Sequence, residues 1–381
     1  MVVVRILLGR VTLLLAALLG VGACAGAGPI PMSLCREAEL EAVVLAGAQG
    51  DGFIAIDGMT VGPDGTAFVL DGGEGSLIAF SPEGDELWRV SGMVSDGPVE
   101  IVGLHWDGEH LVVYDLGRDR LQYWTEFGEL AGEETFTDLG LLELPSWIGS
   151  LGDSGVAAVV PSHSYGSEIE DTEGGLLLVG GVGAPLDTLT FLPPPRLQVL
   201  DLYGHPLPIL SPYQPQPSVT VLPGGSLGVT LGDEYRIGLF NRVSGWLGEI
   251  VGSSAAPAVR TEDRLAFGRL LPDTLLIDQV DLPASHPPIR GLAATADGHL
   301  LVQTSWSYRG SVRWDRWSER GEFLDSFTLP DSLAFVGGVG GLIYGIAVDP
   351  LGALQLEIYR LTGDASCPGP PPVDPSADLS V

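Results

Sequence analysis

Short apolar runs separated by tight turns alternate along most of the chain, and one arrangement of them recurs. After the turn Asp64-Gly65 come the runs TAFVLD and SLIAFSPEG, and after Asp107-Gly108 come EHLVVYD and RLQYWTEFG. Apolar runs of about four to eight residues bounded by Gly, Pro and Asp are typical of short β-strands. Landmarks of the first copy return 44 positions later in the second: Asp71 and Asp115, Leu77 and Leu121, Phe80 and Trp124, Gly84 and Gly128.

The same unit recurs in looser form through the rest of the chain. Two further copies start at 224 and 297, a degraded copy starts at 152, and the last copy spans 339–361. Repeats of about 40–50 residues with four strands each are typical of a β-propeller, whose blades bury their faces only when the ring closes. We therefore predict an all-β, six-bladed propeller of four-stranded blades over 38–361. Seven shorter blades are the alternative.

The two ends of the predicted propeller are expected to meet. The last copy is too short for a fourth strand, whereas ELEAVVLAG (39–47) is a spare strand ahead of the first copy. We expect 39–47 to be the outer strand of the last blade. If it pairs antiparallel with 354–361, Cys35 and Cys367 become neighbours, and we predict a disulfide between them that locks the ring. The alternative is two unpaired thiols, because 362–381 otherwise has the composition of a disordered Pro-rich tail.

The N-terminal segment has the pattern of an export signal. Two arginines flank the start of the apolar run 11–22, which is shorter than the roughly 20 residues that span a bilayer. The segment VGAC (21–24) resembles the lipobox of bacterial lipoproteins, in which the cysteine is lipidated and becomes the new N-terminus. The resemblance implies a signal peptide over 1–23, lipidation of Cys24, a tether over 24–37 and a membrane-anchored protein at the outer membrane or periplasmic face. Simple cleavage and secretion is the alternative.

Charge restricts the partners. The chain has 49 Asp and Glu against 18 basic residues, a formal net charge of −31. So acidic a surface repels phosphate backbones, so we expect no nucleic-acid partner. The densest acidic run, EIEDTEG (168–174), lacks the alternating ladder of a calcium loop.

Several segments resemble bacterial six-bladed β-propeller proteins of the NHL-like and TolB-like kind. VSDGPVEI (94–101) is similar to the GxGPGEF segment that opens their blades, with Val99 and Ile101 in place of the usual Gly and Phe. The segments 284–302 and 314–330 are similar to their later blades. The resemblance covers most of 38–361 and rests on structural turns and strands. It implies an exported propeller that acts as a binding platform, with lyases and hydrolases among its relatives.

The sequence contains no recognisable catalytic motif, so we expect a non-catalytic binding or scaffold lipoprotein of the cell envelope. The alternative is a lyase or hydrolase acting at the channel mouth on an exported polymer or peptide. Calcium-dependent lactonase propellers resemble the predicted fold but use asparagine ligands, and Asn241 is the single asparagine here. We expect no cofactor and no metal site. Among the histidines only His105 and His110 lie close in sequence, on either side of a predicted turn.

Equivalent positions of propeller blades lie on one ring around the axis, which gives a candidate site. Counting seven positions back from the turn of each copy gives Asp57, Glu100, Trp147, Pro217, Arg290 and Leu333. We predict that Asp57, Glu100, Trp147 and Arg290 meet at one mouth of the channel as a polar pocket with a Trp wall, suited to a polar ligand or protein partner. The alternative is structural, with Arg290 bridging an acidic residue across the ring.

Overall fold

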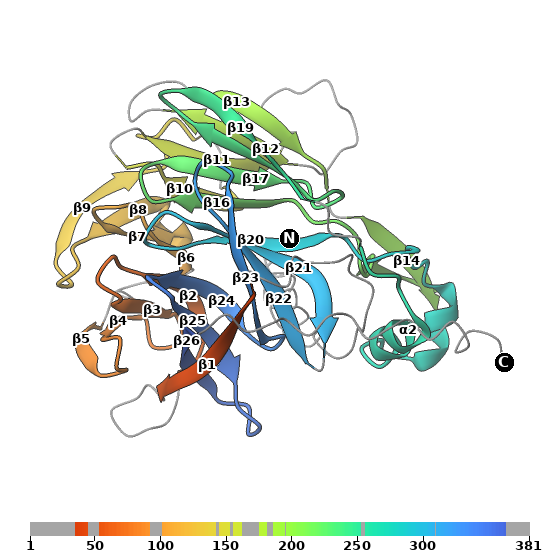
Figure 1. The fold of residues 1–381 in the computed structure, drawn as a ribbon. Helices are drawn as coiled ribbons and strands as arrows, with labels where there is room; N and C mark the ends of the chain where they lie inside the picture. Colours follow the sequence, from red (N-terminus) through yellow and green to blue (C-terminus); the bar gives the residue numbers. More distant parts are fainter. Residues whose placement is uncertain are drawn as a thin grey trace.

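The computed structural model describes residues 35–44, 53–91, 101–141, 145–152, 155–161, 175–180, 186–194, 196–252, 256–308 and 310–362. Most of these residues lie in β-strands and the tight turns between them (Figure 1). Cys24, Glu100, Cys367 and the acidic run 168–174 lie outside the described residues.

Four antiparallel sheets of four strands, here units 1 to 4, follow the order of the chain. Unit 1 contains β2 (Ile56–Val61), β3 (Ala67–Asp71), β4 (Ser76–Phe80) and β5 (Glu86–Val90). Unit 2 contains β6 (Ile101–Trp106), β7 (Leu111–Asp115), η2 (Leu116–Arg118), β8 (Arg120–Trp124) and β9 (Leu130–Thr135). Unit 3 contains β10 (Trp147–Ser150), β11 (Val156–Pro161), β12 (Gly175–Gly180) and β13 (Asp187–Leu192). Unit 4 contains β16 (Ser218–Leu222), β17 (Ser226–Thr230), β18 (Arg236–Asn241) and β19 (Gly245–Val251).

Units 5 and 6 share one eight-stranded sheet because the N-terminal strand bridges them. Unit 5 contains β20 (Ile289–Ala294), β21 (Leu300–Tyr308), β22 (Ser311–Trp317) and β23 (Phe323–Pro330). Unit 6 contains β24 (Ala334–Val339), β25 (Leu342–Val348), β26 (Leu354–Thr362) and, as its outer strand, β1 (Cys35–Val44). β1 pairs antiparallel with β26 and makes a short parallel pairing with β23. The predicted closure of the last blade by the segment ahead of the first repeat is therefore confirmed.

The first strand of each unit lines the centre of the molecule. β2 contacts β6 and β24, β10 contacts β6 and β16, and β20 contacts β16 and β24, so these six strands form a closed ring. The predicted all-β propeller is confirmed. In the described part of the chain, six four-stranded units make up the ring, and the hairpin of β14 (Leu197–Leu202) and β15 (His205–Leu210) is a separate two-stranded sheet outside it.

The two faces of the ring differ in the length of their connections. The inner strands run in the same direction, as the parallel bridge between Thr295 and Gly338 shows. They end at tight turns such as 62–66 and 107–110, on what we call the turn face. They begin at the opposite face, here the insertion face, where 193–217 and 252–288 join successive units. The start of β1 and the end of β26 lie on the turn face, because Leu361 N–H donates to the turn residue Gly341.

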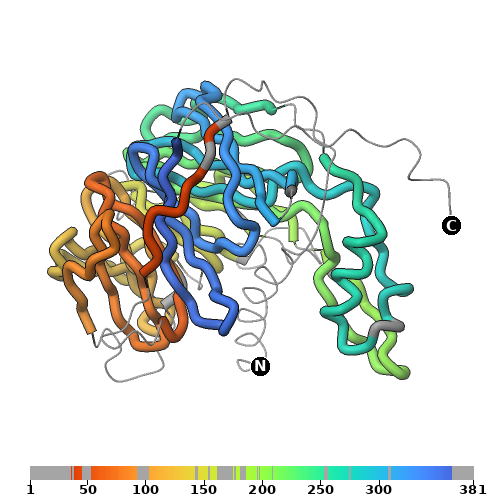
Figure 2. Tube along the Cα trace, turned by 60° about the horizontal axis from the view of Figure 1, so that its bottom comes forward, coloured from red at the N-terminus to blue at the C-terminus, as the bar shows by residue number. Residues whose placement is uncertain are grey.

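The two insertions fold together into a small subdomain beside the ring. The hairpin β14–β15 packs against α2 (Thr261–Gly268) and η4 (Thr274–Gln279) around a core of Leu200, Phe267, Leu276 and Val280. Gln198 and Gln279 join the two insertions, because each side-chain amide bonds the backbone of the other segment. Figure 2 shows this subdomain, drawn in green and cyan, standing away from the main ring.

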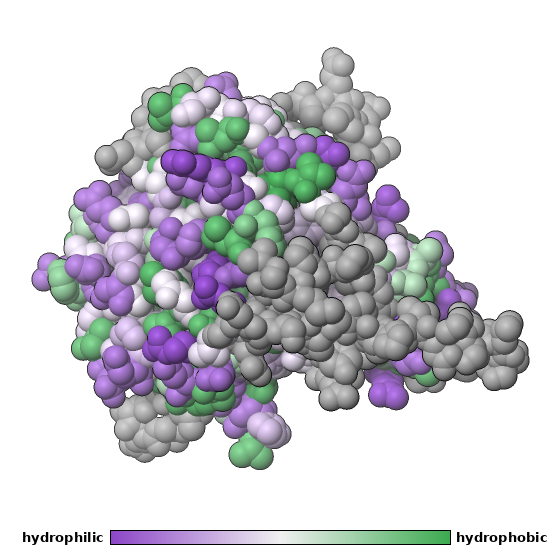
Figure 3. Space-filling view, in the orientation of Figure 1, coloured by the Kyte–Doolittle hydropathy of each residue, from purple (hydrophilic) through white to green (hydrophobic). Residues whose placement is uncertain are grey.

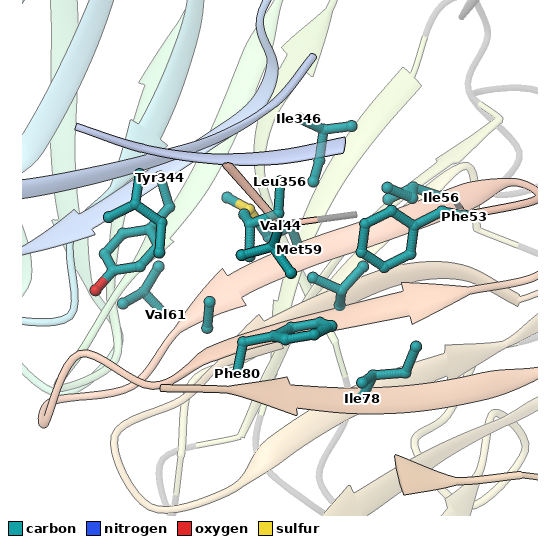
Figure 4. Close-up of a cluster of buried hydrophobic side chains, with 13 residues drawn as sticks. Val44, Phe53, Ile56, Met59, Val61, Ile78, Phe80, Tyr344, Ile346 and Leu356 are labelled. Atoms are coloured by element: carbon teal, nitrogen blue, oxygen red, sulfur yellow. The ribbon is translucent and has the colours of Figure 1, made fainter. Parts of the chain in front are cut away.

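A hydrophobic cluster seals the ring between units 6 and 1 (Figure 4). The cluster includes Ile78 of unit 1 and Tyr344 and Leu356 of unit 6, and all three side chains are fully buried. Val44 adds the end of β1 to the same cluster. Tyr344 Oη also donates to the Gly65 carbonyl across the seam, at 2.7 Å. Each buried side chain of this size stabilises the fold by about 1.5–3 kcal/mol, so closure is strongly favoured.

The face drawn in Figure 3 has a mixed, largely polar surface. Hydrophilic residues cover much of the face in Figure 3 and are interrupted by separate apolar patches. None of the helices among the described residues has the length and apolar composition needed to cross a membrane.

Candidate functional site

A cavity of about 600 Å³ occupies the channel at the centre of the ring. All six inner strands contribute to its wall, from β2 through β24. Much of the wall is apolar, with Leu104, Ile148 and Leu292 among the lining residues. Polar and charged side chains enter it near the insertion face, where the inner strands begin: Ser146, Trp147, Arg290, Gln303, Asp331 and Ser332.

Arg290 reaches the channel from a β-bulge. The pairing of the first two strands shifts between Ile56 and Gly58, Ile101 and Gly103, and Ile289 and Gly291. The extra residue of a bulge leaves the ladder and its side chain is redirected. The recurring Ile-x-Gly triplet therefore sets the position that carries Arg290 in unit 5.

The same bulge corrects the register that was counted from the turns. Asp57, Val102 and Arg290 occupy the bulge in units 1, 2 and 5, so Val102 rather than Glu100 is equivalent to Asp57. The count failed because the two aspartates occupy different places in their turns. The hydrogen bond from Gly62 N–H to Thr66 O closes the first turn, so Asp64 is its third residue. The bond from Asp107 N–H to His110 O closes the second turn, so Asp107 is its first residue. In unit 3 the same count from the turn gives Ser146 in place of Trp147.

The structure brings two of the four predicted site residues together. Trp147 and Arg290 line the same cavity. Asp57 is not among the lining residues, and its carboxylate lies against the backbone of Gly72, where an added Cβ would be 1.7 Å from Oδ2. The predicted meeting of all four at one mouth stays a prediction, because Glu100 lies outside the described residues. Sequence counting missed Gln303 and Asp331, which no repeat landmark marks.

Arg290 presents a positive charge to the channel and has no ion-pair partner among the described residues. Protein surrounds its guanidinium on most sides, and this desolvation lowers the pKa of Arg290, although the cavity keeps the side chain accessible to water. The pKa lowering is opposed by Asp331 and Tyr213. Among the described residues no carboxylate oxygen lies within 4.0 Å of an Arg290 nitrogen. The guanidinium nevertheless stays charged at neutral pH, as arginine does in proteins.

Asp331 places a negative charge in the same mouth. It lies between units 5 and 6, where its N–H donates to the Gly310 carbonyl at 2.9 Å. Partial burial raises the pKa of Asp331, and the charge of Arg290 partly opposes this rise. The two opposite charges therefore influence each other across the cavity without forming an ion pair within 4.0 Å.

The insertions reach the mouth through Tyr213. Its ring lies edge-on to His286, with centroids 4.5 Å apart, and its Oη donates to the Asp263 carbonyl. Burial raises the pKa of Tyr213 to about 12, and the charge of Arg290 limits this rise. Asp263 Oδ2 lies 3.1 Å from His286 Nε2 and accepts the Arg260 N–H at the start of α2. This buried pair therefore joins α2 to the end of the second insertion, directly ahead of β20.

A histidine and a tyrosine of the cavity wall could act in proton transfer, but both already hydrogen-bond to the backbone. His105 lines the cavity, and its Nε2 accepts the Ser150 N–H at 2.8 Å. Burial lowers the pKa of His105 to about 4, against the opposing charge of Asp107. Tyr114 donates its Oη proton to the Pro145 carbonyl at 2.6 Å. Across the described ranges no cluster of three His, Cys, Asp or Glu side chains could hold a metal ion.

Comparison with known proteins identifies no family. No family model matches the chain, and no curated protein matches it. Among solved structures it is similar to a streptogramin B lyase, at 11% identity over 84% of this chain and 97% of that chain, with a TM-score of 0.41. An exported protein from Bacteroides fragilis shows 10% identity over 87% and 99%, with a TM-score of 0.45. A gluconolactonase from Xanthomonas campestris shows 14% identity over 90% and 99%, with a TM-score of 0.39. These values carry no inference about function, and the fold assignment rests on the strand topology.

Proposed function

We propose that this protein is a non-catalytic binding protein of the cell envelope, whose channel mouth on the insertion face holds a small polar ligand. The observation that carries the proposal is the meeting of Arg290, Asp331 and Gln303 in one water-accessible cavity of about 600 Å³. A pocket of this size with apolar walls and a few convergent polar groups is the usual form of a small-molecule site.

Binding is favoured over catalysis by the state of the reactive groups. A general base needs a free lone pair near the reacting atom. His105 uses its Nε2 to accept a backbone N–H, and Tyr114 donates to a backbone carbonyl. The polar groups left to contact a ligand are a guanidinium, an amide, hydroxyls and the Asp331 carboxylate, and of these only the carboxylate could act as a general base.

The ends of the ring suggest how the protein is oriented. The start of β1 and the end of β26 lie on the turn face, whereas Arg290 lies toward the insertion face. A lipid on Cys24 would attach the chain some ten residues ahead of β1. We infer that such an anchor holds the turn face toward the membrane and leaves the channel mouth open to the periplasm or the exterior.

Lipidation is tested by metabolic labelling with a radioactive fatty acid. Wild-type protein should carry the label and Cys24→Ser should lose it, because the thiol of Cys24 is the predicted attachment point. Cys35→Ser is the matched control and should keep the label. Equal labelling of wild type and Cys24→Ser would show that Cys24 is not the anchor. Two acyl chains are needed for stable attachment, so the unlabelled variant should also be released from membranes.

Ligand binding is tested by thermal unfolding against a library of small polar metabolites. A ligand at about 100 times its Kd stabilises the fold by roughly 2.7 kcal/mol. Ser146→Trp should fill the mouth and remove every such stabilisation, whereas Ser146→Ala should keep it, since Ser146 lines the cavity and is exposed. A response that survives in Ser146→Trp would place the site elsewhere. Chemical conversion of a bound compound would instead support the lyase or hydrolase.

A further inference from the structure

The mouth of the channel holds two opposite charges that do not neutralise each other directly. Arg290 and Asp331 line the same cavity, from the first strand of unit 5 and from the connection that leads into unit 6. Neither side chain forms an ion pair within 4.0 Å with a described residue. Charged groups inside proteins are normally paired, because moving an unpaired charge out of water costs free energy. Both charges line a cavity that a ligand can enter, so both could contact one partner.

The groups around the two charges complete a site with one polar end. Gln303 lies opposite Gly291 in the β20–β21 pairing, next to the strand position of Arg290. Its amide supplies both a donor and an acceptor. Below this level Leu292, Ile148 and Val221 line the cavity, together with the polar residues Thr60, Thr220 and His105. A ligand held here would therefore place its charged groups at the mouth and an apolar body in the channel.

We propose that the ligand is a zwitterion of the amino-acid class, with its carboxylate on Arg290 and its ammonium group on Asp331. The proposal rests on the channel-mouth binding function and adds the chemistry of the ligand. A guanidinium binds a carboxylate through two parallel hydrogen bonds, and a carboxylate accepts from an ammonium group. An apolar side chain would extend between Leu292 and Ile148.

The charge of the whole chain favours a zwitterion over a simple anion. The formal net charge is −31, so an anion is repelled as it approaches, and Asp331 opposes it again inside the mouth. A simple cation is attracted by the surface but meets Arg290 in the channel. A neutral zwitterion avoids both penalties and satisfies both charges.

The test compares leucine and phenylalanine with their N-acetyl and amide derivatives by isothermal titration calorimetry on the full chain. N-acetylation removes the ammonium charge, and amidation removes the carboxylate. The free amino acid should bind roughly 10- to 100-fold more tightly than either derivative, the range expected for losing a charge-assisted hydrogen bond. In the Arg290→Gln variant, the affinity for the free amino acid should fall to the affinity for its amide. In the Asp331→Asn variant, the affinity for the free amino acid should fall to the affinity for its N-acetyl derivative.

Matched controls separate the site from changes in net charge. Arg320→Gln and Asp85→Asn change the same charges in exposed turns of the turn face and should leave affinity unchanged. Arg290→Lys keeps the charge without the bidentate geometry and should recover part of the affinity lost in Arg290→Gln. Equal or tighter binding of the N-acetyl derivative would contradict the proposal that the ligand is a zwitterion, and would leave the proposed binding function intact. Absence of amino-acid binding would also overturn it, and the metabolite library then decides the binding function separately.

Discussion

Replacing Asp325 with alanine should lower the free energy of unfolding by about 3–5 kcal/mol. Asp325 lies in β23, and its two carboxylate oxygens accept from Arg316 at 2.9 and 2.5 Å. It also pairs with Arg36 of the closing strand at 3.0 Å. Both Asp325 and Arg316 are buried. Alanine would leave the guanidinium of Arg316 buried and unpaired, and would remove the ion pair that joins Arg36 of β1 to unit 5. Urea unfolding followed by tryptophan fluorescence measures the loss.

Two further variants identify the cause of that loss. Arg36→Ala removes only the more exposed partner, whose side chain is 41% exposed, and should cost less than about 1 kcal/mol. The double variant Arg316→Met, Asp325→Leu replaces the buried pair by apolar groups and should recover most of the stability. If Asp325→Ala were no less stable than Arg36→Ala, the buried charge would not be the source of the effect.

Lowering the pH from 6.5 to 4 should cost wild-type protein about 3 kcal/mol more than a His105→Gln variant. Burial lowers the pKa of His105 from 6.5 to about 4 in the folded protein. In this interval the unfolded chain binds a proton that the folded chain does not. Stability from this group is therefore complete above pH 6.5 and falls by about 1.4 kcal/mol per pH unit as the pH drops toward 4.

The comparison is made by urea unfolding of both proteins at pH 4.0, 5.0, 6.5 and 7.5. Acidic residues titrate in both proteins, so their contribution cancels in the difference. Glutamine retains an acceptor for the Ser150 N–H, which limits the other effects of the substitution. Parallel stability curves for the two proteins below pH 6.5 would show that His105 takes up its proton freely in the fold.

The candidate site was predictable in part. The repeat predicted that inner-strand residues of different units meet around one channel, and Trp147 and Arg290 do line it. Matching Glu100 to Asp57 was wrong, because counting back from a turn ignores both the length of the turn and the bulge that follows Ile101. Asp331 and Gln303 could not be found, since no repeat marks them. The β20–β21 pairing places Gln303 beside Arg290, and the connection after β23 places Asp331 in the same cavity.

The repeat, the strands and the identity of the closing strand follow from the sequence, because short apolar runs, tight turns and a missing fourth strand are local features of the chain. Which side chains share the channel depends on how the units assemble in three dimensions. Arg290 and Asp331 come from successive units, while Asp57, at the bulge position equivalent to that of Arg290, lies against Gly72. The direction of a side chain depends on bulges and on neighbouring units, which are non-local. The joining of residues 193–217 and 252–288 into one subdomain is non-local in the same way, since its core is assembled from both insertions.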